Sequence, residues 1–187
     1  MILNKAYKGG IDMKKILIVI DMQNDFIDGV LGTGEAEGIV ENVVKKIEAH
    51  DGIIYATRDT HAEDYLNTNE GKHLPVKHCI KNTKGWEINP LVEKAMKNTY
   101  PAYKIVDKPA FGSLKLAELI KEEAENDEIE VELIGVCTDI CVVSNALLIK
   151  ASLPEIKVSV DESCCAGTTP ENHNAAINTM KMCQVEI

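Results

Sequence analysis

Aromatic side chains are scarce in this chain of 187 residues, which holds one tryptophan, two phenylalanines and five tyrosines. Hydrophobic residues of all kinds make up 45% of the sequence and aromatic residues only 4%, so the core must be aliphatic. The chain also lacks any hydrophobic run close to the roughly 20 residues that a membrane-spanning helix needs. The length fits a single domain with a core of its own, because domains typically hold roughly 100–200 residues.

Positive charge is also in short supply. Lysine and arginine together number 20, against 30 aspartates and glutamates, which gives a formal net charge of −10. This balance repels phosphate backbones and anionic lipids, so we expect neither a nucleic acid nor a membrane as a partner. Residues 1–15 contain no apolar segment of the kind found in secretory signals. We therefore expect a cytoplasmic protein with reduced cysteines.

Short β-branched runs alternate with amphipathic segments along the chain. The run Ile16–Ile20 reads ILIVI, which is typical of a strand buried on both faces. Further strands are predicted at Ile53–Thr57, Tyr103–Val106, Glu130–Ile134, Ile156–Val160 and Gln184–Ile187. Helices are predicted at Glu35–His50, Pro90–Asn98, Ser113–Glu125, Asp139–Ala151 and Pro170–Met182. The alternation predicts an α/β protein with a three-layer Rossmann-like fold, in which helices cover both faces of a mainly parallel six-stranded sheet.

The beginning of the predicted domain is indicated by the segment MKKILIVIDMQ, which starts at Met13 directly before the first strand. Residues 1–12 show no hydrophobic periodicity. We therefore expect residues 1–12 to be an N-terminal extension and residues 13–187 to form one domain.

Chemically useful side chains follow the predicted strands, where ligands bind in parallel α/β sheets. Asp21 follows the first strand, Lys108 the third, and Cys141 opens the helix after the fourth. A helix N-terminus and a nearby ammonium favour a thiolate, and a carboxylate can accept the thiol proton. The residues alone leave other roles open: a helix cap for Asp21, a surface charge for Lys108 and a core position for Cys141. No GxGxxG or Walker A motif suggests a nucleotide site.

Four strings at these strand ends resemble one family. They are IVIDMQNDF, YATRDTH, VDKPAFGS and GVCTDICV, in this order. Together they resemble the isochorismatase-like cysteine hydrolases, and among them the nicotinamidase/pyrazinamidase group, over Lys15–Ile187. The resemblance implies a catalytic triad of Asp21, Lys108 and Cys141, and the family spacing favours Lys108 over Lys104. It also implies a homo-oligomer that acts on a small-molecule amide.

The implied chemistry is amide hydrolysis through a thioester on Cys141. Backbone N–H groups of Cys137 and Cys141 would hold the oxyanion, and the family has a cis peptide that corresponds to Val136–Cys137. Nicotinamide is the first candidate substrate. Another small amide, a ureido compound or an N-carbamoyl compound is the alternative, and so is isochorismatase-type ether hydrolysis, which needs no thiol. A receiver-like binding module is a further alternative, but it would have no use for the GVCTDIC turn.

The resemblance further implies a metal site on Asp59, His61 and His78. These ligands suit Zn²⁺ and also Mn²⁺ or Fe²⁺. A fourth ligand is not assigned, and His73 is a nearby candidate.

The substrate pocket departs from the family pattern. Many nicotinamidases carry a Trp-Pro-Pro-His stretch whose tryptophan contacts the substrate ring, whereas Leu74 and Pro75 stand in that region here. The single tryptophan, Trp86, lies beyond it and is interpreted as a packing residue. The two phenylalanines, Phe26 and Phe111, lie within the family strings and are the predicted pocket residues.

Overall fold

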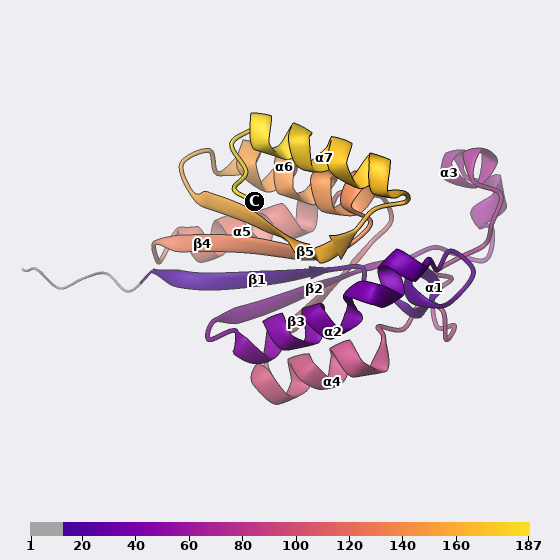
Figure 1. Cartoon of the computed structure of the whole chain (residues 1–187), viewed down its shortest axis with the longest axis horizontal. Helices are drawn as coiled ribbons and strands as arrows, with labels where there is room; N and C mark the ends of the chain where they lie inside the picture. The colour runs from indigo at the N-terminus through magenta and orange to yellow at the C-terminus, as the bar shows by residue number, and fades with distance from the viewer. Residues whose placement is uncertain (1–12) are drawn as a thin grey trace, which may run out of the picture.

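The computed structural model describes residues 13–187, so the expected extension at residues 1–12 lies outside the described residues. Five strands form a single parallel sheet in the order β3-β2-β1-β4-β5 (Figure 1). Their bounds are β1 Lys14–Ile20, β2 Ile53–Asp59, β3 Lys104–Lys108, β4 Ile129–Val136 and β5 Lys157–Ala166. The α/β class and the parallel sheet are thus confirmed.

Helices cover both faces of this sheet, as predicted. Their bounds are α1 Asn24–Ile27, α2 Gly34–Ala49, α3 Asn69–His73, α4 Pro90–Thr99, α5 Leu114–Ala124, α6 Val143–Ser152 and α7 Pro170–Met182. In Figure 1, α2 and α4 lie on one side of the sheet and α5, α6 and α7 on the other. The described residues also form a 3₁₀ turn at Tyr65–Asn67 and a π-helical turn at Thr138–Val142.

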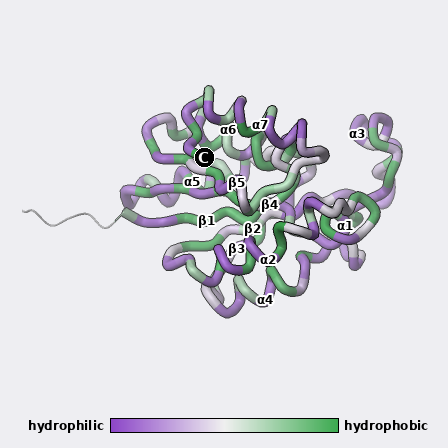
Figure 2. The backbone as a smooth tube through the Cα atoms, in the orientation of Figure 1, coloured by the Kyte–Doolittle hydropathy of each residue, from purple (hydrophilic) through white to green (hydrophobic). Residues whose placement is uncertain are grey.

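The alternation of side chains along β1 explains the two layers. Leu17 and Val19 belong to one hydrophobic cluster, which includes residues of α2 and α4. Ile16, Ile18 and Ile20 point the other way and pack with residues of α5, α6 and α7. Both faces of the central strand are therefore buried, and Figure 2 shows β1 as a mostly hydrophobic segment in the middle of the molecule.

Two predicted elements differ in the structure. The expected sixth strand, Gln184–Ile187, is wrong, because this segment forms only an isolated parallel bridge between Ser159 and Glu186. α7 continues to Met182, and the backbone N–H groups of Gln184 and Val185 donate to carbonyl oxygens of its last turn rather than to a neighbouring strand. The helix expected from Asp139 starts instead as the π-helical turn and becomes α-helical only at Val143.

The order of the strands places a crevice at the carboxyl ends of β1 and β4. The chain runs from β1 outward to β2 and β3 and then returns to the other side of β1 to form β4 and β5. Ligands bind at such switch points in open parallel sheets. The short helices α1 and α3 lie beyond this same edge of the sheet (Figure 1). Within residues 13–187, every helix is too short or too polar to cross a membrane.

Candidate active site

Three side chains from separate elements meet at this crevice. Asp21 directly follows β1, Lys108 is the last residue of β3, and Cys141 lies in the π-helical turn after β4. The Nζ atom of Lys108 lies 2.7 Å from Oδ2 of Asp21 and 3.4 Å from Sγ of Cys141. Asp21 is 0%, Lys108 1% and Cys141 5% exposed, so the group is shielded from water. The structure thus brings the predicted triad together, while its catalytic role stays a prediction.

The backbone and a threonine orient Asp21. Its φ of 47° lies in the left-handed region, which aspartate tolerates better than most residues do. The hydroxyl of Thr57 on β2 donates a hydrogen bond of 2.6 Å to Oδ1 of Asp21. The backbone N–H of Asp21 in turn donates to Thr57 Oγ1 at 3.2 Å. One carboxylate oxygen is therefore bound to Thr57 and the other faces Lys108.

Burial sets the electrostatics of these groups. It is the largest influence on Asp21 and raises the pKa of this carboxyl group, against the opposing effect of Lys108. Burial and the nearby charge of Asp21 also raise the pKa of the Cys141 thiol well above its ordinary value. Burial would lower the pKa of Lys108, but the adjacent carboxylates and thiol outweigh it and raise that pKa. The lysine therefore stays charged, and the thiol keeps its proton until a base removes it.

The alternative lysine, Lys104, points away from this group. It begins β3, its side chain is 56% exposed, and its Nζ donates to the hydroxyl of Tyr55 at 3.1 Å. Lys104 and Lys108 are four residues apart on one strand, so both side chains lie on the same face but near opposite ends of the strand. Only Lys108 reaches the carboxyl edge.

The turn after β4 carries both predicted oxyanion residues. The peptide bond between Val136 and Cys137 is cis, as the resemblance implied. Asn145 of α6 supports the turn, because its side-chain amide donates to the carbonyl oxygen of Cys141 at 2.8 Å. The Oδ1 atom of Asn145 accepts a hydrogen bond of 2.9 Å from the backbone N–H of Ser113, which caps α5. The cysteine turn is thus tied to two helices.

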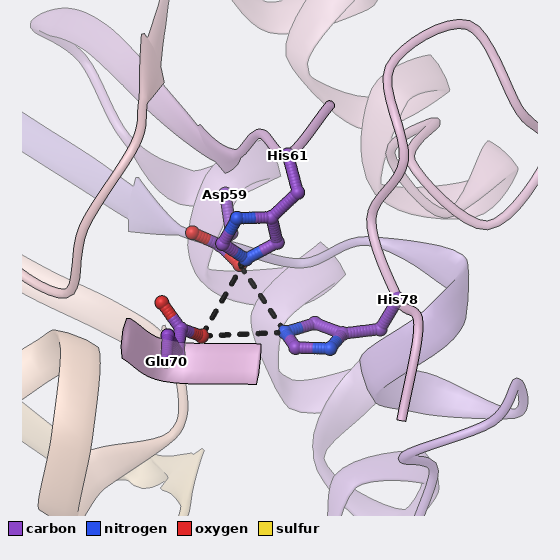
Figure 3. Close-up of side chains that lie close together, drawn as sticks. All are labelled: Asp59, His61, Glu70 and His78. Atoms are coloured by element: carbon purple, nitrogen blue, oxygen red, sulfur yellow. Dashed lines mark ion pairs between the residues drawn. The ribbon is translucent and has the colours of Figure 1, made fainter. Parts of the chain in front are cut away.

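Beside the triad, four side chains form a group that could hold a metal ion. They are Asp59, His61, Glu70 and His78, and their potential ligand atoms lie within 4.8 Å of one another. Figure 3 shows the four side chains pointing toward a common centre. The three residues from the resemblance are joined here by Glu70 of α3, which the sequence did not identify. The nearby candidate His73 is exposed, and its Nδ1 pairs with the carbonyl oxygen of Asn69 at 2.8 Å.

The geometry of the histidines fits a divalent cation. His61 Nε2 lies 2.7 Å from Asp59 Oδ2 and 3.5 Å from Glu70 Oε1, yet it has no hydrogen-bond partner among the described residues. His78 pairs its Nδ1 with the carbonyl oxygen of Val76 at 2.8 Å, which leaves its Nε2 facing the group. Two imidazole nitrogens and two carboxylates are a donor set that first-row divalent metals accept.

A cavity of about 270 Å³ lies between the metal group and the cysteine turn. Asp59, Glu70 and His78 of the metal group line it together with Val136 and Cys137, whereas Cys141 itself is not among the lining residues. Its remaining walls are mainly apolar and include Phe26, Leu31, Leu74, Phe111, Ile140 and Ala166. Ligand pockets usually span roughly 300–1,000 Å³, so this cavity suits a small molecule.

The two phenylalanines lie where the sequence predicted them, at the cavity. Phe26 is buried and its ring centroid lies 5.6 Å from that of His78, while Phe111 is 47% exposed at the cavity's rim. Trp86 packs in the hydrophobic cluster of α2 and α4, and its indole N–H donates to Thr60 Oγ1 at 2.8 Å. It does not line the cavity, where Leu74 stands instead.

A buried thiol with a carboxylate, an ammonium and a group of candidate metal ligands at the edge of a parallel sheet is an arrangement typical of hydrolytic enzymes. The sequence relationship names the family. Residues 15–187 match the isochorismatase domain, and the chain belongs to this family. It is therefore a hydrolase.

Individual relatives agree with this assignment. The chain is 30% identical over 176 residues to the uncharacterized isochorismatase family protein PncA of Bacillus subtilis. The alignment covers 89% of this chain and 93% of that protein. The crystal structure of nicotinamidase/pyrazinamidase PncA from Bacillus subtilis superposes with a TM-score of 0.79 at 26% identity, over 93% of this chain and 98% of that one. The pyrazinamidase of Pyrococcus horikoshii in complex with zinc gives a TM-score of 0.75, with the same identity and coverage.

Proposed function

We propose that this protein is a metal-dependent amidohydrolase that cleaves a small amide, with nicotinamide as the first candidate, into a carboxylic acid and ammonia. The observation that carries the proposal is the cavity, whose lining combines Cys137 and Ile140, next to Cys141 in the turn after β4, with three of the four candidate metal ligands. Similarity to nicotinamidase and pyrazinamidase structures supports the amide as substrate.

The triad residues perform the covalent chemistry in this proposal. Asp21, whose pKa is raised by burial, accepts the thiol proton of Cys141 as Sγ attacks the amide carbonyl carbon. Backbone N–H groups of Cys137 and Cys141 stabilise the oxyanion, and Lys108 balances the charge that develops on sulfur and carboxylate. Asp21 then gives its proton to the leaving nitrogen, which departs as ammonia. A water molecule, deprotonated by Asp21, hydrolyses the thioester and restores the thiol.

The metal group orients the substrate in this proposal. Asp59, His61, Glu70 and His78 would hold a divalent cation, of which Zn²⁺ is the first candidate and Mn²⁺ or Fe²⁺ are the alternatives. When bound, such an ion supplies a Lewis-acid position for a lone pair of the substrate, such as a pyridine nitrogen. Phe26 and Phe111 provide apolar walls for an aromatic ring.

An ammonia-release assay tests the function. We expect turnover of nicotinamide or pyrazinamide, and a loss on the order of 10³-fold or more in kcat for Cys141→Ala. Cys183→Ala is the matched control, because this exposed thiol lies at the end of α7, away from the cavity. Full activity of Cys141→Ala would exclude the thioester mechanism. Activity only on ureido or N-carbamoyl compounds would assign the alternative substrates.

Metal removal tests the proposed role of a bound divalent cation. We expect dialysis against a chelator to abolish turnover and lower Tm, and Zn²⁺ to restore both. A ligand at a hundred times its Kd stabilises the folded state by about 2.7 kcal/mol. An enzyme that remains fully active without bound metal would contradict this role of the four ligands.

A further inference from the structure

Asp25 in α1 has no part in the mechanism above, although it belongs to the same DMQNDF segment as Asp21. Its side chain is half-buried and faces the loop that carries His78. Oδ2 of Asp25 accepts a hydrogen bond of 2.7 Å from the backbone N–H of Cys79, the residue directly after His78. The backbone N–H of Asp25 donates to the carbonyl oxygen of Gly85 at 2.9 Å, near the end of the same loop.

The backbone of Cys79 lies between two candidate metal ligands. Its φ of 45° is a conformation that cysteine rarely adopts, so external contacts must hold it. The N–H of Cys79 is bound by Asp25, and its carbonyl oxygen accepts from the backbone N–H of His61 at 3.0 Å. The backbone N–H of Lys81 donates to the carbonyl oxygen of His61 at 2.9 Å, so two backbone hydrogen bonds join His61 to the segment from Cys79 to Lys81. The position of His78 relative to His61 therefore depends on the backbone conformation of Cys79.

A second side chain of the same segment holds another ligand in a similar way. Gln23 is fully buried, and its Oε1 accepts from the backbone N–H of Asp59 at 2.7 Å. Its Nε2 donates to the carbonyl oxygen of Asp59 at 2.9 Å. The segment after β1 thus forms hydrogen bonds to the backbone of Asp59 through Gln23 and to the backbone beside His78 through Asp25.

We propose that Asp25 is a positioning residue of the metal site, which acts on His78 through the backbone of Cys79. The inference rests on the metal site of the proposed function but not on the identity of the substrate. Partners that orient ligands in this way commonly change metal affinity by about 10–100-fold when they are lost. Loss of the carboxylate frees the Cys79 backbone and lets His78 leave its place opposite Asp59 and Glu70.

Gly85 offers an independent way to disturb Asp25. A Cβ atom at Gly85 would overlap the carboxylate of Asp25, so Gly85→Ala must displace this group without touching a metal ligand. Asp28, at the C-terminal end of the same short helix, is exposed and serves as the matched control for loss of one negative charge.

The experiment measures the affinity of the full-length protein for Zn²⁺, by competition with a chromophoric chelator, and the absorption spectrum of the Co²⁺ form. We expect Asp25→Ala and Gly85→Ala to lose about 10–100-fold in affinity and to change the Co²⁺ spectrum. Asp25→Asn should lose less, because its amide oxygen can still accept from Cys79. Asp28→Ala should match the wild type in both measurements.

Several outcomes would overturn the inference. One is a folded Asp25→Ala variant with wild-type affinity and an unchanged Co²⁺ spectrum. If Asp25→Ala does not fold, wild-type affinity for Zn²⁺ in both Asp25→Asn and Gly85→Ala would also refute the role of Asp25. A wild-type protein that binds no metal refutes the inference together with the metal site. A protein that binds metal but hydrolyses no amide refutes only the proposed function, and the affinities of the variants still decide the role of Asp25.

Discussion

Lys108 lies close to two carboxylates and to the thiol of the site. Its Nζ lies 2.7 Å from Asp21, 3.5 Å from Asp59 and 3.4 Å from the sulfur of Cys141. It thereby links the triad with the metal group. Its remaining hydrogen bond goes to the carbonyl oxygen of Ala110 at 3.1 Å, so the ammonium is held from several sides.

Replacement of Lys108 should therefore affect both stability and activity. Lys108→Met leaves the carboxylate of Asp21 buried without its counter-ion, and loss of one partner of a buried pair costs about 3–5 kcal/mol. Urea unfolding measures this loss, and ammonia release should become undetectable. Lys104→Met is the control, with an expected effect of at most about 1 kcal/mol because the side chain is exposed. Equal stability of the two variants would contradict this account of Lys108.

The pH dependence of activity reports on Asp21. In the proposed mechanism the carboxyl group of Asp21 must be ionised to accept the thiol proton, and burial raises its pKa above the ordinary value of 3.8. Activity is therefore lost as pH falls through this raised pKa, and the acid limb of kcat/KM should lie above pH 3.8. The hydrogen bond from Thr57 lowers the pKa of Asp21, so Thr57→Val should move the limb to higher pH. A shift toward lower pH would refute the assignment of this limb to Asp21.

At the scale of elements, the end of β4 decides where the cysteine turn lies. Gly135 pairs with Ile20 of β1 and has a φ of +119°, which glycine alone adopts readily. A Cβ atom at Gly135 would overlap the carbonyl oxygen of Ile20. Close approach of the two strands therefore requires glycine directly before Val136 and the cis peptide.

A pair of glycine substitutions tests this requirement. Gly135→Ala should destabilise the protein by about 1–3 kcal/mol through the backbone conformation alone, and the overlap with β1 should lower kcat as well. Gly38→Ala, on the exposed face of α2 with open space around it, should instead stabilise by about 0.5–1 kcal/mol. Thermal unfolding and ammonia release measure both variants. A Gly135→Ala variant as stable and active as the wild type would show that the strand end tolerates a side chain.

At the scale of the whole molecule, β1 joins the two halves of the sheet and supplies both faces of the core. It pairs with β2 on one side and β4 on the other, and its last residue leads directly to Asp21. The site therefore depends on a strand that begins at Lys14. We propose that residues 13–187 form the domain, in agreement with a family match that begins at residue 15.

Shortened chains test this boundary. A chain that begins at Met13 should keep its kcat/KM, and its Tm should change by less than about 2–4 °C, the shift expected from about 1 kcal/mol in a protein of this size. A chain that begins at Leu17 loses Lys14, Lys15 and Ile16, which pair with Ile129–Val131 of β4, and should unfold at a much lower temperature. A large loss of stability in the Met13 variant would show that residues 1–12 belong to the domain.

The sequence by itself determined the order of the five strands and of the five long helices, and most of the candidate site. Runs such as ILIVI favour buried strands, and Ser113 and Thr169 cap the helices that follow them, because these preferences act over a few neighbouring residues. The residues of the proposed triad and three of the four candidate metal ligands could be named from their motifs at the strand ends.

Only the tertiary structure decided which further groups reach the site. Glu70 lies on a helix of five residues, which has too few hydrogen bonds to form alone and is placed by packing against the rest of the chain. The contact of Asp25 with Cys79 spans 54 positions of the chain, and no local pattern indicates it. Local preferences favour the elements, but distances between remote loops depend on how the elements pack, and so the fourth candidate ligand and the support of His78 emerged only in the folded protein.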